Sequence, residues 1–85
     1  MTDQKVLEAV QMVLTKIGSS PETICRYTAE YAHLSMMAEK IPGFLEEGRR
    51  DKAMRWLGFM QGVLWKMGLA SVEDLKAMNR SEDNG

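Results

Sequence analysis

The sequence of 85 residues has one cysteine, one histidine and no long hydrophobic run. Because Cys25 has no second cysteine, an internal disulfide is excluded, and Cys25 with His33 is too small a set of ligands for zinc. We therefore expect no metal and no other cofactor. No stretch of 18 apolar residues is present to span a membrane, and the N-terminus lacks the pattern of a signal peptide. The expected location is the cytoplasm, where a cysteine stays reduced.

Neither sign of charge is in large excess. The chain has 11 Lys and Arg residues against 12 Asp and Glu residues, a net charge of −1, so its overall field does not attract nucleic acid. Gly48, between two expected helices, fits the turn of a helix-turn-helix. The helix after it is mostly apolar, however, whereas a recognition helix presents polar side chains to the DNA groove. Nucleic acid is therefore not an expected partner.

The chain length allows a single core, and domains this small are often stabilised by disulfides, metal or oligomerisation. With the first two excluded, oligomerisation remains. Period-two alternation is absent and helix-forming residues dominate. We predict an all-α fold, a small bundle of three main helices plus a short C-terminal helix. The single helical domain is expected over residues 1–79, followed by a disordered acidic tail over 80–85.

Glycines and capping residues predict the helix boundaries. Gly18, Gly48 and Gly68 each follow an amphipathic run, where a left-handed residue commonly ends a helix. The spacing of apolar residues predicts helices over 3–17, from 21 onward, over 50–67 and over 72–78. Ser71 and Asp74 have the spacing of a capping box at the start of the last helix.

The second helix contains Pro42. Proline lacks a backbone donor and crowds the preceding turn, so we expect a kink or a break over residues 39–41. An apolar seam from Ile24 to Leu45 keeps its phase across the proline, which favours a kinked helix over two unrelated ones. Cys25 lies on a second strip of mostly small residues and is expected to be a buried structural thiol.

The helix over 50–67 is apolar on most of its circumference, which is more than one small core requires. Aromatic and methionine-rich surfaces are common at protein interfaces. Two of its glycines share one face and each costs about 1 kcal/mol relative to alanine, which close approach of another helix, within the chain or across a dimer, would offset. The interface candidates are Trp56, Gly58, Phe59, Gly62, Val63 and Trp65.

Four basic residues, Arg49, Arg50, Lys52 and Arg55, open the same helix. Free backbone donors at a helix N-terminus also favour anions, so this basic cluster is the candidate site for a nucleotide or another phosphate ligand. The alternative is a solvated helix start whose charges pair with the acidic residues at 46, 47 and 51. We favour the alternative, because ion pairs are common on helix surfaces.

No grouping of residues indicates a reaction. Cys25 and His33 are eight residues apart on one helix, which is a poor geometry for a nucleophile and its base. Small helical dimers such as chorismate mutases use an arginine-rich first helix, which this chain lacks. An enzyme is therefore not expected. Gln61 is expected either to meet a partner across an interface or to lie on a narrow solvent strip.

The segment over 53–65, AMRWLGFMQGVLW, followed by Gly68, Leu75 and Asn79, resembles the C-terminal half of small uncharacterised proteins encoded by bacteriophages and prophages. The resemblance implies a phage accessory protein in the host cytoplasm and transfers no catalytic residue. Phage proteins of this size often block a host protein or sequester a signalling nucleotide. We expect a non-enzymatic homodimer or larger homo-oligomer that binds a protein partner and inhibits a host factor. The alternative is a binder of phosphate ligands.

Overall fold

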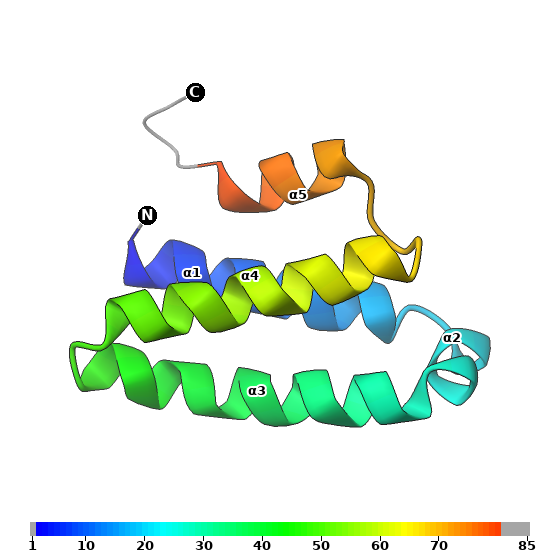
Figure 1. The fold of residues 1–85 in the computed structure, drawn as a ribbon, viewed down its shortest axis with the longest axis horizontal. Helices are drawn as coiled ribbons and strands as arrows, with labels where there is room; N and C mark the ends of the chain where they lie inside the picture. Colours follow the sequence, from blue (N-terminus) through cyan, green and yellow to red (C-terminus); the bar gives the residue numbers. More distant parts are fainter. Residues whose placement is uncertain (1, 81–85) are drawn as a thin grey trace.

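Five α-helices make up the computed structural model, which describes residues 2–80 (Figure 1). They are α1 (Asp3–Ile17), α2 (Pro21–Arg26), α3 (Thr28–Glu46), α4 (Arg50–Lys66) and α5 (Val72–Asn79). The long helices α1, α3 and α4 lie side by side, and α5 packs on the side that faces away from α3. The predicted all-α bundle of three main helices and a short C-terminal helix is confirmed. The predicted tail lies, apart from its first residue, outside the described residues.

Side-chain caps fix where three of the helices begin. The Thr2 hydroxyl accepts a hydrogen bond from the Lys5 N–H at 3.1 Å at the start of α1. The Ser20 hydroxyl accepts a hydrogen bond from the Thr23 N–H at 3.1 Å, and Pro21 occupies the first turn of α2. At α5, the Ser71 hydroxyl accepts from the Asp74 N–H at 3.1 Å, and the Asp74 carboxylate accepts from the Ser71 N–H at 2.9 Å. The predicted capping box is therefore confirmed.

Left-handed glycines end α3 and α4. Gly48 and Gly68 have φ of 78° and 74°, which a residue without a Cβ adopts at little cost. After α4, the Leu69 N–H donates to the Leu64 carbonyl at 3.0 Å, as in a Schellman motif. Two of the three predicted left-handed glycine caps are therefore confirmed.

Gly18 ends α1 in a different way. Its φ is −97°, so the left-handed conformation expected there is wrong. A Cβ at this position would lie 3.1 Å from the Leu14 carbonyl oxygen and 3.2 Å from the Tyr31 ring. A larger residue at position 18 would therefore require the Tyr31 ring or the Leu14 carbonyl to shift by a few tenths of an ångström, and glycine allows α3 to approach without that shift.

The second predicted helix is interrupted at Tyr27, where φ is −118° and ψ is 42°, and not near Pro42. The Thr28 hydroxyl donates to the carbonyls of Ile24 and Cys25 at 3.0 Å each, and so takes a place that backbone donors fill in a continuous helix. α3 runs through Pro42 without a break. Pro42 is exposed, so water can reach the turn that its missing N–H leaves short of a donor.

The core lies between α1, α3 and α4, with α5 and the loop before it completing it. α1 buries a single stripe, α3 buries the middle of the predicted seam, and α4 buries Leu57, Met60 and Leu64. α2 contributes no buried residue. The buried apolar residues are Val6, Ala9, Val10, Val13, Ile17, Leu34, Met37, Ile41, Ala53, Leu57, Met60, Leu64, Ala70 and Met78.

Candidate interaction surfaces

The two arginines at the start of α4 pair with carboxylates. Arg50 turns toward α1, where its Nε lies 2.9 Å from Asp3 Oδ1. Arg49 pairs with Glu47 at 3.4 Å. Both pairs are on the surface, where an ion pair contributes little to stability. The pairing predicted for position 47 is confirmed, whereas the acids at 46 and 51 form no ion pair with another residue of the 2–80 range.

Lys52 lies instead over a pair of aromatic rings. Phe44 of α3 and Trp56 of α4 meet edge to face, with ring centroids 4.8 Å apart and planes at 81°. The Lys52 Nζ is 4.7 Å from the Phe44 centroid and 5.8 Å from the Trp56 ring, within the range of cation–π attraction. Arg55 is exposed. Arg49 shares the Phe44 ring with Lys52, since its Cζ lies 5.4 Å from the same centroid, whereas Arg50 turns to Asp3. Arg49 and Arg50 of the basic cluster are therefore already paired with carboxylates, which disfavours a phosphate site.

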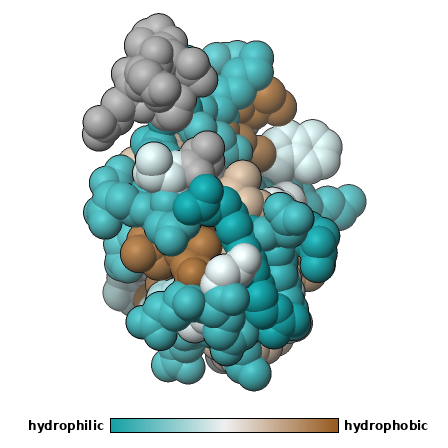
Figure 2. Space-filling model, turned by 90° about the vertical axis from the view of Figure 1, so that its left-hand side faces the viewer, coloured by the Kyte–Doolittle hydropathy of each residue, from teal (hydrophilic) through white to brown (hydrophobic). Residues whose placement is uncertain are grey.

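Figure 2 views the end of the bundle at which α3 joins α4. Hydrophilic side chains cover most of this end, and a hydrophobic patch is exposed among them. Two residues of the basic cluster, Arg49 and Lys52, border apolar surface, since both lie over the Phe44 ring.

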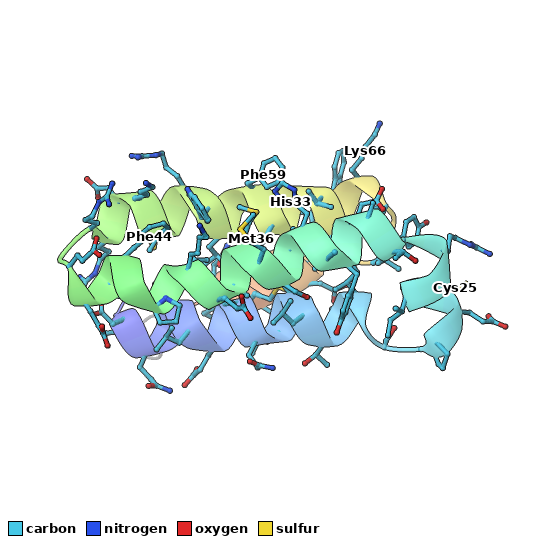
Figure 3. All side chains as sticks on the ribbon, turned by 90° about the horizontal axis from the view of Figure 1, so that it is seen from below. Cys25, His33, Met36, Phe44, Phe59 and Lys66 are labelled. Atoms are coloured by element: carbon cyan, nitrogen blue, oxygen red, sulfur yellow. The ribbon has the colours of Figure 1, made fainter. Side chains whose placement is uncertain are left out.

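The first exposed apolar surface is a groove between α3 and α4, here called the α3–α4 groove, formed by Ala29, His33, Met36, Phe59 and Val63. The Phe59 side chain is 54% exposed, and its ring centroid lies 6.0 Å from that of His33. Figure 3 shows both rings and Met36 along the boundary of the two helices. A hollow of about 240 Å³ opens between Ala29, His33, Phe59 and Val63. Two interface candidates, Phe59 and Val63, therefore line a shared concave site.

The second surface is the outer side of α4, here called the glycine strip, formed by Met54, Gly58, Gly62 and Trp65. Trp65 is 55% exposed and Met54 is 38% exposed. A Cβ at Gly58 or Gly62 would meet no atom within 4 Å. Of the two alternatives expected at these glycines, close approach of a helix from the same chain is not found, because α4 turns the glycines toward solvent. Close approach by a second copy stays a prediction.

Gln61 is buried and faces α5. Its side-chain Nε2 donates to Asn79 Oδ1 at 2.8 Å, and Asn79 Nδ2 donates to Gln61 Oε1 at 3.0 Å. Neither position expected for Gln61 is found, since it lies neither on a solvent strip nor free for a partner. The uncharged polar side chain inside an apolar helix was a signal for a buried partner, but the sequence did not identify Asn79, which lies 18 residues away.

The reactive side chains are separate from one another. Cys25 is exposed, so its predicted burial is wrong, because α2 contributes nothing to the core (Figure 3). His33 is exposed as expected. Glu30 and His33 have the Glu-x-x-His spacing that di-metal bundles use on two helices. Within residues 2–80, however, no three potential metal ligands come together.

A second hollow, of about 480 Å³, lies between α1 and α5 and includes Met12, Lys16 and Asp74 in its lining. Lys16 Nζ is 4.0 Å from Asp74 Oδ2. Hydrogen bonds from the backbone N–H and the hydroxyl of Ser71, together with the charge of Lys16, lower the pKa of Asp74. Because this carboxylate already caps α5, its role is structural.

In comparisons with known proteins, no family model matches the chain, and no curated protein and no solved structure is significantly similar to it. The resemblance of residues 53–65 to phage proteins therefore stays a prediction. No helix in the described part of the chain is long and apolar enough to cross a membrane.

Proposed function

We propose that this protein is a non-enzymatic interaction module that associates with itself and binds a second protein. The observation that carries the proposal is the exposure of Phe59 and Trp65, which are 54% and 55% exposed on two different sides of α4. The same helix contributes Leu57, Met60 and Leu64 to the core. Large exposed aromatic residues in contiguous apolar surface are typical of binding sites.

Self-association is assigned to the glycine strip, because its shape suits a second copy. We consider two α4 helices that pair antiparallel, with the two-fold axis crossing each helix at the level of residue 60. Gly58 of one copy then faces Gly62 of the other, and Arg55 faces Trp65. The bare glycines allow the helix axes to come close, and each Arg55 gains a cation–π contact. The interface is self-complementary, as a two-fold dimer requires.

Light scattering after size exclusion tests the self-association. We expect a mass of at least twice the 9.6 kDa chain at about 10 µM protein, a concentration at which interfaces of ordinary affinity form. Trp65→Gln should lower the mass, whereas Met12→Gln, which changes an exposed methionine of α1, should not. A wild-type protein that is monomeric at this concentration would contradict the proposal.

The resemblance to phage proteins supports a host protein as the second partner, which this protein would inhibit in the host cytoplasm. Capture of host proteins by wild type and by Phe59→Gln tests this part, since a specific partner should be lost with the groove residue. Phosphate binding by the basic cluster is less well supported, because Arg49 and Arg50 are already paired with carboxylates.

A further inference from the structure

We infer that the α3–α4 groove binds an amphipathic helix of a partner protein, which places one large apolar side chain beside Phe59 and acidic residues against Lys52 and Lys40. The inference rests on the proposed function and deepens it by giving the chemistry of the partner. Phe59 supplies the apolar anchor point and Lys52 the charge.

The shape of the groove suits a helix. Two antiparallel helices border it, and its hollow of about 240 Å³ has Ala29 and Val63 on opposite walls. The Phe59 ring and Met36, 54% and 39% exposed, extend the apolar surface along the helix axes. An elongated apolar groove of this kind binds the apolar face of an amphipathic helix, which places side chains at i, i+3, i+4 and i+7 in the groove.

Basic side chains flank the groove although the chain as a whole has a net charge of −1. Lys40 lies one helical turn after Met36, Lys52 lies seven residues before Phe59, and Lys66 projects on the side of Phe59 (Figure 3). Across residues 2–80, none of these three lysines forms an ion pair. The rim therefore has unused positive charge, which complements an acidic partner.

Of the three lysines on the rim, Lys52 is expected to attract a carboxylate of the partner most strongly. Its side chain is partly buried over Phe44 and Trp56, with Nζ 4.7 Å from the Phe44 centroid. A charge held against aromatic rings is less screened than one in bulk water, so a carboxylate placed there is attracted more strongly. At the opposite end of the groove, where Lys66 lies three residues after Val63, Glu30 also lines the hollow and adds a negative charge. The acidic residues of the partner are therefore expected at the Lys52 end.

The register of the partner follows from α4. Seven residues separate Phe59 from Lys52, which is about 10 Å along a helix. A partner helix lying along the groove should thus have its apolar anchor and its acidic residue about seven positions apart.

Three synthetic helical peptides test the inference. They share one leucine and phenylalanine stripe and differ only in having Glu, Gln or Lys at the positions seven residues from the anchor. Fluorescence anisotropy with the full chain should give a Kd for the Glu peptide about tenfold or more below that for the Lys peptide. The preference should fall in Lys52→Gln and Lys40→Gln, remain in Lys5→Gln on α1, and weaken with added salt.

Equal affinity for the Glu and Lys peptides, or no binding of any peptide at about 1 mM, would overturn the inference. A loss of oligomer mass in Phe59→Gln would also overturn it, because a second copy would then occupy the groove. If wild type is monomeric and yet prefers the Glu peptide, the self-association fails and the acidic partner stands. If wild type is oligomeric and shows no preference among the peptides, the self-association stands and the acidic partner fails.

Discussion

The helices α1 and α4 are similar in length, 15 and 17 residues, and each buries five residues. They differ in the number of large hydrophobic residues that they leave exposed to solvent. α1 has one large exposed hydrophobic residue, Met12, whereas α4 has three, Met54, Phe59 and Trp65. Since both helices meet the needs of the core with the same number of buried residues, the additional apolar surface of α4 has no use in folding the monomer. This excess is why we propose that α4 carries the interaction surfaces.

The largest expected effect is a difference in stability between substitutions on the buried side and on the exposed side of α4. Leu64 is fully buried, so Leu64→Ala should lower the free energy of unfolding by about 2–5 kcal/mol. Phe59→Ala removes a larger side chain from an exposed position and should change it by about 0.5 kcal/mol or less. Urea denaturation of the two variants measures both. Equal losses would show that Phe59 belongs to the core and would remove the distinction between the helices.

The second effect concerns the polar residue that α4 buries and α1 does not. Gln61→Ala removes the two hydrogen bonds between Gln61 and Asn79, and at about 0.5–1.5 kcal/mol for each bond it should cost about 1–3 kcal/mol. Backbone amides of α5 should exchange with deuterium faster, because the contact that holds α5 to α4 is lost. Gln11→Ala, an exposed change on α1, is the matched control. Unchanged exchange in α5 would show that the Gln61–Asn79 pair does not hold that helix.

The third expected effect is a gain in stability, whereas the first two are losses. Gly58→Gln and Gly62→Gln introduce a better helix former where a Cβ meets nothing, so each should stabilise the monomer by about 0.5 kcal/mol. Gly43→Gln in α3 has equally open space and serves as the control. Thermal unfolding at a protein concentration low enough to keep the chain monomeric gives the comparison. Destabilisation at 58 or 62 alone would mean that the strip is covered within the chain.

The smallest effect belongs to the contact between α1 and α5. The folded-state pKa of Asp74 is lowered from 3.8, so its carboxylate stabilises the fold above that pH, and this contribution is lost as pH falls through the folded-state pKa. Asp74→Asn keeps an oxygen acceptor for the cap and removes the charge. The melting temperature of the variant should be slightly lower than that of wild type at pH 7, and the two should converge in acid. A difference that persists at low pH would assign the effect to the cap alone.

Much of the fold was predictable because its signals are local. Ser71 and Asp74 lie three residues apart, and Gly48 and Gly68 end helices through hydrogen bonds to their own last turns. At the interruption at Tyr27, the Thr28 hydroxyl donates to the Ile24 and Cys25 carbonyls. This contact is local too, but a threonine does not by itself predict a break, because Thr15 makes the same kind of bond to Gln11 inside the unbroken α1. The predicted burial of Cys25 was wrong because α2 contributes nothing to the core.

The sites were less predictable because their contacts are distant in the sequence. Gln61 meets Asn79 across 18 residues, and Arg50 meets Asp3 across 47. The apolar excess of α4 could be counted from the sequence. Its division into the α3–α4 groove and the glycine strip could not, because that depends on which side of α4 each neighbouring helix covers.

Sedimentation equilibrium of wild type and of the double variant Gly58→Gln with Gly62→Gln tests most directly whether the outer side of α4 is an interface. Wild type should sediment as a dimer or larger species, and the double variant as a folded monomer, while Gly43→Gln retains the wild-type mass. An unchanged oligomer in the double variant, or a monomeric wild type, would contradict the account.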